Sequence, residues 1–185
     1  MKILFENADI LLRSGEKFTV AENSFLAVDD DTISYIGSQR PDGDFDETKN
    51  MSGRLLMPGL INCHNHSPMV LLRGVGSDLP LQQWLFDTVF PIEDRLTAEE
   101  IKAGSELALL EMIAGGTVSF SDMYFEPQTT IQAVADAGMK ANITRPVQSF
   151  DPNETPEQSY RIKESLELYD KYNNSFDGRV LIDFC

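Results

Sequence analysis

The chain contains 2 histidines, His64 and His66, and a single residue separates them. They follow the run LMPGLINC directly, which is typical of a buried β-strand. Side chains at positions i and i+2 of a strand project from the same face, so a strand that continues through Asn65 would place both imidazoles together. Neutral imidazole binds zinc, iron, nickel or copper. The spacing therefore indicates two ligands of one metal ion.

Two imidazoles do not complete such a site, because a catalytic zinc usually has three protein ligands and a water molecule. A histidine pair at a strand end is also compatible with ordinary polar surface. Asp122 and Asp183 belong to later strands and could serve as ligands in principle, but carboxylates at strand ends more often accept hydrogen bonds from loops or helix ends. Cys63 should lie on the opposite face of the strand and pack against helices.

Other catalytic signatures are missing from the sequence. It contains neither a glycine-rich nucleotide-phosphate motif nor a GxSxG nucleophile elbow. The HxE and PCxxC pair of the small zinc deaminase fold is also absent. The histidine pair is therefore the strongest chemical signal in the chain.

The elements that must position this pair begin with β-structure. Residues 1–50 combine β-branched and aromatic residues with turn-forming Gly, Asn and Asp. A hairpin is predicted with its turn at residues 29–31 and its second strand at residues 32–36. The polar segment 40–50 is expected to be a loop.

After residue 50 the pattern changes to alternating strands and helices. Strands are expected at residues 53–64, 117–125, 140–149 and 178–185, and helices at residues 97–114, 127–139 and 155–172. The first of these helices should begin at a capping box, since Glu100 stands three residues after Thr97, and end at Gly115. Its buried face is expected to carry Ile101, Leu107, Ala108 and Met112.

This alternation predicts an α/β fold with parallel strands and right-handed crossovers. An open doubly wound sheet and a (β/α)8 barrel both fit. A barrel needs eight strands, so in that case the chain holds only the first half, with about four strands. The carboxyl end of the first parallel strand, where the histidines stand, is where active sites of such folds lie.

The charge and hydrophobicity of the chain limit the kinds of partner that it is expected to bind. The net charge is −15, from 15 Lys and Arg and 30 Asp and Glu, which disfavours nucleic acid and anionic membranes as partners. No apolar stretch is long enough to span a bilayer and the start lacks the pattern of a signal peptide, so a cytoplasmic location is expected. Cys63 and Cys185 are expected to be reduced.

The segment LLMPGLINCHNHSPMVLLRGVGSDLPLQQWLFDTVFPIEDRLTAEEI resembles the amidohydrolase superfamily, and LALLEMIAGGTVSFSDMYF continues the match. Within the superfamily the chain is most similar to the deaminases of 5-methylthioadenosine and S-adenosylhomocysteine, near the triazine chlorohydrolases. The resemblance implies that residues 1–55 are a β-sandwich segment, incomplete without a C-terminal part. It also implies that residues 56–185 are the N-terminal half of a (β/α)8 barrel.

The resemblance further implies one divalent metal ion, usually zinc. His64 and His66 match the ligands of barrel strand 1, while a His of strand 5 and an Asp of strand 8 would complete the set. A Glu after strand 5 and a His on strand 6 would transfer protons. No catalytic residue of this kind is found in the chain, and all are expected beyond Cys185. In the family the metal-bound water attacks C6 of adenine and ammonia leaves.

Four further residues match the substrate pocket of the family. Trp84 matches an aromatic wall, and Glu93 matches a carboxylate that accepts hydrogen bonds from the ribose hydroxyls. Arg145 matches an arginine of the pocket. Arg161 matches a second arginine, which would meet the homocysteine carboxylate. The implied substrate is a small purine nucleoside.

Several alternatives remain open at this stage. The same type of site could dechlorinate triazines or deaminate guanine or cytosine, and a truncated remnant without catalysis is also compatible. A binuclear cyclic amidase is disfavoured, because residues 179–185 contain no lysine. We expect the 185-residue chain alone to be inactive, and to associate with a second copy or with the missing half. The sequence leaves the metal, the preferred nucleoside and the oligomeric state undecided.

Overall fold

The computed structural model describes residues 1–147, 149 and 151–185, and it divides the chain into two compact units, Met1–Pro58 and Gly59–Cys185. The division expected after residue 55 lies within the short strand β5 (Leu55–Leu56). The assignment of the units as a β-sandwich segment and half of a barrel stays a prediction.

The first unit is a single five-stranded sheet with the order β3-β2-β1-β4, and β5 also pairs with β1. Its other strands are β1 (Lys2–Ser14), β2 (Lys17–Asp29), β3 (Thr32–Gly37) and β4 (Glu47–Asn50). The predicted hairpin is confirmed, since β2 and β3 pair in antiparallel fashion. The predicted loop 40–50 is wrong in its last part, because residues 47–50 pair in parallel with β1. Backbone pairing therefore overrides the polar character of this segment.

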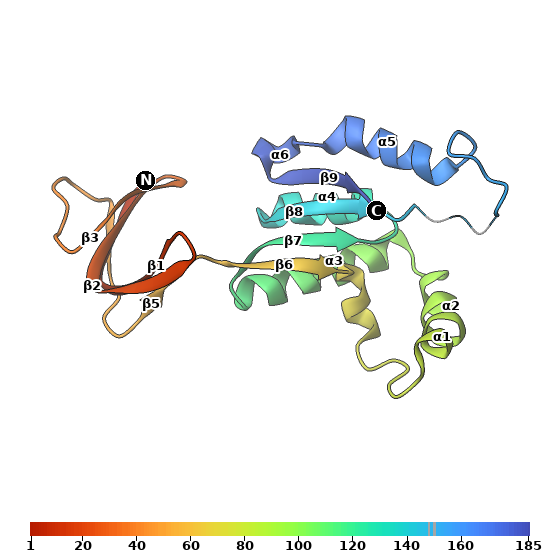
Figure 1. Cartoon of the computed structure of the whole chain (residues 1–185), viewed down its shortest axis with the longest axis horizontal. Coiled ribbons are helices and arrows are strands. Elements are labelled where there is room, and N and C mark those ends of the chain that lie inside the picture. The colour runs from red at the N-terminus through yellow and green to blue at the C-terminus, as the bar shows by residue number, and fades with distance from the viewer. Residues whose placement is uncertain (148, 150) are drawn as a thin grey trace. The chain divides into compact units, whose positions relative to one another are not determined.

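The second unit contains a four-stranded sheet with the order β6-β7-β8-β9, in which every pairing is parallel (Figure 1). The strands are β6 (Leu60–Asn65), β7 (Thr117–Met123), β8 (Lys140–Arg145) and β9 (Val180–Phe184). The longer helices are α3 (Ala98–Ala114), α4 (Pro127–Ala137) and α5 (Tyr160–Tyr172), with a short α6 (Ser175–Gly178). The predicted α/β class with a parallel sheet is confirmed.

Short helical pieces connect β6 to α3. They are the 3₁₀-helix η1 (Ser67–Leu72), α1 (Leu81–Gln83), the π-helical η2 (Trp84–Val89) and α2 (Phe90–Glu93). π-Helical turns are rare in proteins, and those that occur are often found at functional sites. This connection is therefore the first place to look for ligand-binding side chains.

Helix α3 begins at the capping box that the sequence predicts. The Thr97 side chain accepts a hydrogen bond from the Glu100 amide at 3.3 Å, and the Glu100 carboxylate accepts one from the Thr97 amide at 2.8 Å. The predicted buried face is partly wrong, because Leu107 is 39% exposed. The small residues Gly104 and Ser105 are buried instead: Gly104 lets η1 approach α3 closely, and the Ser105 hydroxyl lies 3.1 Å from the Thr130 hydroxyl of α4.

Two further boundaries differ from expectation. Strand β8 ends at Arg145, just before a proline that cannot continue the ladder. Of the strand predicted at 140–149, Gln148 lies outside the described residues. Helix α5 starts at Tyr160 and not at residue 155, because residues 156–158 form a separate turn, in which the Ser159 amide donates to the Thr155 carbonyl. Helix α4 ends at Gly138 as predicted, with φ +71°.

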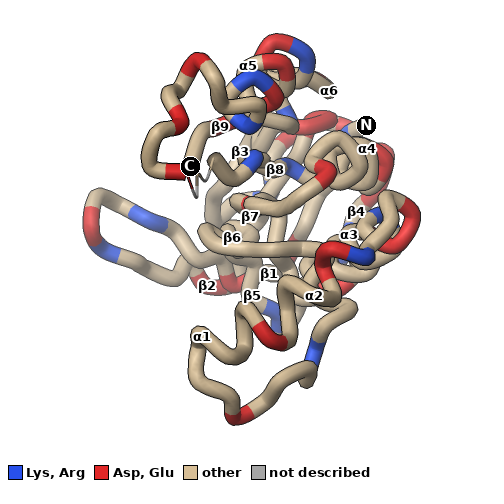
Figure 2. The backbone as a smooth tube through the Cα atoms, turned by 90° about the vertical axis from the view of Figure 1, so that its right-hand side faces the viewer, with Lys and Arg blue, Asp and Glu red and all other residues tan. Residues whose placement is uncertain are grey.

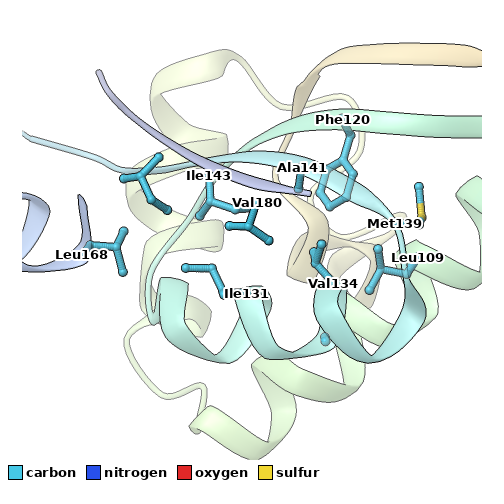
Figure 3. Close-up of a cluster of buried hydrophobic side chains, with 11 residues drawn as sticks. Leu109, Phe120, Ile131, Val134, Met139, Ala141, Ile143, Leu168 and Val180 are labelled. Carbon is cyan, nitrogen blue, oxygen red and sulfur yellow. The ribbon is translucent and has the colours of Figure 1, made fainter. Parts of the chain in front are cut away.

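The core of the second unit lies between the sheet and its helices (Figure 3). Alternate residues of β7, β8 and β9 point into it, and Phe120, Ile143 and Val180 are at most 1% exposed. The whole cluster is Leu109, Phe120, Ile131, Ala133, Val134, Met139, Ala141, Ile143, Leu168, Val180 and Ile182. This packing fixes the strands, and the carboxyl ends of parallel strands gather at one edge of the sheet.

Charged residues lie mainly on loops and helices, and β6 carries none (Figure 2). Acidic and basic positions are interspersed along the chain. Among the described residues, none of the helices combines the length and hydrophobicity that crossing a bilayer requires.

Candidate functional site

The structure brings the two histidines together at the end of β6. Their ring centroids are 4.9 Å apart and the ring planes are nearly perpendicular, at 81°. The pairing of β6 with β7 shifts register here: Asn62 faces Phe120 but Asn65 faces Asp122, so β6 holds one more residue than β7 in this interval. Such a bulge redirects side chains and is frequent beside active sites. A regular strand through Asn65 is thus only part of the reason that the rings meet.

A hydrogen bond to the backbone of β7 fixes the tautomer of His66. Its Nδ1 lies 2.7 Å from the carbonyl oxygen of Met123, at the end of β7. A carbonyl oxygen can only accept, so Nδ1 carries the hydrogen and donates it. The lone pair of Nε2 is therefore left for a metal ion, which is the usual arrangement of metal-binding histidines in proteins.

Asp122 is a buried hydrogen-bond acceptor. Its Oδ1 accepts from the Ser67 amide and its Oδ2 from the Ser67 hydroxyl, both at 2.7 Å. Burial raises the pKa of Asp122, while the two hydrogen bonds from Ser67 and the charge of His66 act in the opposite direction. The carboxylate thus caps the start of η1, in agreement with the expected loop or cap role.

The other possible ligands lie apart from the pair. Asp183 in β9 accepts from the Phe184 amide and from the side chain of Asn142. Cys63 was expected to pack against helices, and this is wrong: it is exposed, because β6 ends the sheet on one side and its register shifts just after Asn62. The described part of the chain contains no group of three or more His, Cys, Asp or Glu that could hold a metal ion.

A cavity of about 430 Å³ opens beside His66 and brings all four predicted substrate residues together. It lies at the carboxyl ends of β7 and β8, and the connection between β6 and α3 forms its other wall. Its lining is His66, Met69, Trp84, Leu85, Val89, Phe90, Glu93, Asp94, Met123, Tyr124, Phe125, Arg145, Pro146 and Arg161. A second cavity, of about 520 Å³, contains both His64 and His66. His66 is thus common to both cavities.

Trp84 is held by its own hydrogen bond and by a close backbone approach. Its indole Nε1 donates to the Val75 carbonyl at 3.2 Å. Gly76 adopts φ +70°, and a Cβ atom there would lie 2.8 Å from the Trp84 ring. Glycine at this position therefore serves both the turn and the seating of the aromatic wall.

Glu93 supplies a half-buried carboxylate at the end of α2. Burial raises the pKa of Glu93, and the neighbouring Tyr124 hydroxyl and the charge of His66 oppose that rise. Burial and the nearby Glu93 carboxylate both raise the pKa of Tyr124. The Glu93 carboxyl group and the Tyr124 phenol thus influence each other's pKa in the cavity wall.

Sequence reasoning missed Tyr124. Its side chain is 5% exposed, and its buried hydroxyl has no hydrogen-bond partner of ordinary geometry among the described residues, although Glu93 is close enough to affect its pKa. Buried hydroxyls in folded proteins are nearly always partnered. The signal that could have found it is its place two residues after Asp122, just past a strand end.

Two guanidinium groups line the cavity with Glu93. The Arg145 side chain is 12% exposed and its Nε donates to Glu164 Oε2 at 3.2 Å. It also lies over the Phe125 ring, 5.5 Å from the centroid. Arg161 lies 4.8 Å over the Tyr160 ring. The cavity therefore offers acceptors for hydroxyl groups, donors for an anionic group and an aromatic and aliphatic lining between them.

Comparison with known families matches residues 55–180 to the family described as the amidohydrolase family. A relative from Acetivibrio thermocellus named 5-methylthioadenosine/S-adenosylhomocysteine deaminase is 37% identical over 186 residues. That match covers 98% of this chain and 42% of the relative. The resemblance drawn from the sequence is thereby confirmed.

Solved structures show the same fold. An atrazine chlorohydrolase from Arthrobacter aurescens TC1, complexed with zinc, superposes with a TM-score of 0.82 at 21% identity over 98% of this chain and 46% of that one. An adenosine deaminase from Xanthomonas campestris, with bound zinc, gives a TM-score of 0.77 at 25% identity over 98% of this chain and 42% of that one. The chain spans less than half the length of each of these proteins.

Proposed function

We propose, from the premise that the chain belongs to the amidohydrolase family, that it supplies one part of the active site of a metal-dependent deaminase. The substrate is an adenine nucleoside or thioether of the 5-methylthioadenosine and S-adenosylhomocysteine type. The reaction replaces the amino group at C6 by oxygen and releases ammonia. The parallel sheet is, in this proposal, the first half of a (β/α)8 barrel.

The chemistry of the histidine pair fits a single divalent ion, and zinc is the metal that we propose. His64 and His66 would hold it, His66 through Nε2, because Nδ1 is engaged with the Met123 carbonyl. When bound, the ion supplies Lewis acidity and a water of lowered pKa. The 2 histidines of the chain are fewer than the three protein ligands that such a site needs, so the remaining ligands come from outside it.

The single observation that carries the substrate proposal is the cavity shared by His66, Trp84, Glu93, Arg145 and Arg161. The Glu93 carboxylate offers two acceptor oxygens to a vicinal diol such as that of ribose. The Trp84 ring would pack against the nucleoside. The two guanidinium groups would bind the carboxylate of a homocysteine moiety.

Other members of the family define the alternatives. Triazine dechlorination, and deamination of guanine or cytosine, would use the same metal-binding pair but have no use for the Glu93 carboxylate as a diol acceptor. The 37% identity to the Acetivibrio thermocellus relative, named a 5-methylthioadenosine/S-adenosylhomocysteine deaminase, supports an adenine nucleoside as substrate. The 21% identity to the atrazine chlorohydrolase supports only the shared fold. A remnant without catalysis is the alternative of a different class. Association with a second copy stays a prediction.

The test combines metal binding with complementation. The 185-residue chain should bind zinc, measured by competition with a chromophoric chelator, and His64→Ala and His66→Ala should each abolish that binding. With zinc and 5-methylthioadenosine, the chain alone should release no ammonia. Activity should appear when it is coexpressed with the part of the Acetivibrio thermocellus deaminase that it does not cover.

The outcomes separate the alternatives. Turnover of guanine or a triazine, and not of adenine nucleosides, by the complemented enzyme would refute the substrate. Absence of both zinc binding and activity would favour the remnant. Glu93→Gln should raise the KM for 5-methylthioadenosine more than that for an analogue that lacks both ribose hydroxyls, and an equal effect on both would refute the role of Glu93.

A further inference from the structure

We propose that Asp122 is a positioning residue that holds His66 in the orientation needed to bind metal; this inference rests on the proposed metal site. Asp122 is not a ligand in this arrangement. It acts through Ser67, the residue that follows His66, and through the backbone that it shares with Met123.

The first step is the fixation of the chain directly after His66. Both carboxylate oxygens of Asp122 accept hydrogen bonds from Ser67, one from its amide and one from its hydroxyl, at 2.7 Å each. Ser67 is 1% exposed and Asp122 is 2% exposed, so water does not compete for these bonds. With its amide and side chain both held, Ser67 leaves the backbone at the end of β6 little freedom.

The second step is the fixation of the imidazole itself. The carbonyl of Met123, the residue after Asp122, accepts the hydrogen of His66 Nδ1 at 2.7 Å. Two consecutive residues at the end of β7 thus bind the two residues that directly follow β6: the side chain of Asp122 binds Ser67 and the carbonyl of Met123 binds His66. We call this arrangement the 122–123 clamp. It fixes ring orientation and tautomer together.

The third step connects the clamp to the rest of the sheet. Thr144 in β8 donates its hydroxyl hydrogen to the backbone carbonyl of Asp122 at 3.1 Å, and this threonine is 6% exposed. The clamp is therefore anchored on a strand whose other face contributes Ile143 to the core. The position of His66 depends on three adjacent strands and not on the end of β6 alone.

The clamp also compensates for the irregular pairing of β6. Register between β6 and β7 shifts between Asn62 and Asn65, and neither His64 nor His66 is among the paired residues of the ladder. The side-chain bonds of Asp122 extend the attachment to β7 beyond Asn65, to the residue that follows His66. The buried Asp122 carboxylate accordingly accepts a hydrogen bond on each of its oxygens from Ser67, the residue that follows His66.

The test uses the 185-residue chain, zinc and two variants of Asp122. Asp122→Ala removes the clamp and should weaken zinc binding by about 10- to 100-fold, the usual effect of losing a partner that orients a metal ligand. Asp122→Asn should stay within about threefold of the native affinity, because an amide can accept from the Ser67 amide and donate to the Ser67 hydroxyl. Asp183→Ala, in the same sheet but away from the histidines, should leave zinc binding unchanged.

A second readout needs no metal. The chain has 2 histidines, so imidazole ¹⁵N chemical shifts can be assigned with His64→Gln alone. The native chain and Asp122→Asn should show His66 with the hydrogen on Nδ1, and Asp122→Ala should show a mixture of tautomers. Native zinc affinity together with an unchanged His66 spectrum in a folded Asp122→Ala would overturn the proposal.

Two further outcomes are decisive. If Asp122→Ala does not fold, Ser67→Ala removes the hydroxyl bond only, and unchanged zinc affinity and tautomer in that variant would equally refute the clamp. If the native chain binds no zinc, the proposed metal site fails, while the tautomer measurement still decides whether Asp122 positions His66.

Discussion

Substitution of Gly104 by alanine should destabilise the second unit, against the usual effect of this change in a helix. Gly104 lies on the buried face of α3, opposite η1. A Cβ atom at this position would lie 2.7 Å from the Pro68 carbonyl oxygen, 3.0 Å from the Pro68 Cα and 3.1 Å from Leu71 Cδ1. Two of these three atoms belong to the backbone, which cannot yield as a flexible side chain would.

Two opposing effects set the change in the free energy of unfolding that Gly104→Ala causes. Alanine in place of glycine inside a helix stabilises by about 0.5–1 kcal/mol through backbone entropy. Overpacking of a well-filled interface costs about 1–3 kcal/mol. The contact distances fall in the range where a backbone must move, so the cost should exceed the gain. We expect a net loss of about 1 kcal/mol, or a fall in Tm of about 2–4 °C.

Urea unfolding followed by far-ultraviolet circular dichroism measures this difference directly. Leu110→Ala is a matched control on the same helix, since Leu110 is 64% exposed, and it should change stability little. Because η1 starts at the residue after His66, Gly104→Ala should also weaken zinc binding. A Gly104→Ala chain that is more stable than the native chain would refute the close packing of η1 on α3.

Three further changes test other parts of the second unit. Thr97→Ala removes the capping box and should lower the free energy of unfolding by about 1 kcal/mol in a urea titration, whereas Thr97→Ser should keep most of it. Tyr124→Phe removes a buried hydroxyl without a partner among the described residues, so it should raise stability by about 1 kcal/mol; a loss would show that the hydroxyl bonds to Glu93 in solution. Burial raises the pKa of Glu93, so the folded chain binds the carboxyl proton more tightly than the unfolded chain does. The contribution of this proton to the free energy of unfolding is complete at a pH below the ordinary glutamate pKa. It is lost as the pH rises through the raised pKa of the folded chain. The stability gained by Glu93→Gln should therefore grow as pH rises from acidic to neutral, and a gain independent of pH would contradict the cause.

Local signals explain the parts of the fold that could be predicted from the sequence. The start of α3 was predictable, because the Thr97 and Glu100 pair satisfies helix-end amides within a single turn. The parallel sheet was predictable because strands and helices alternate with distinct hydrophobic periods. The face of α3 was predicted less well, since hydrophobicity favours Leu107, while the packing of η1 requires a small residue at Gly104 and the contact with α4 buries Ser105.

The candidate site depends on distant parts of the chain, and this limited what could be predicted. The histidine pair was visible from its spacing, but the shift in strand pairing that accompanies it was not. Trp84 and Glu93 were identified by resemblance, because nothing in their local sequence shows that they share a cavity with Arg145. Nothing in the local sequence singles out Tyr124, whose buried hydroxyl lacks a hydrogen-bond partner of ordinary geometry among the described residues.

The core of the second unit has a consequence for how the polypeptide acquires its structure. Apart from Met139, its members come from α3, β7, α4, β8, α5 and β9, which follow one another along the chain, and each strand pairs with the next in sequence. Paired strands are nevertheless far apart in sequence, since Leu60 pairs with Thr117 and Ala141 with Val180, so these pairings close long loops. Parallel sheets are slow to form for this reason. Each new strand of this sheet therefore finds its partner already synthesised, but only after the intervening segment has been made.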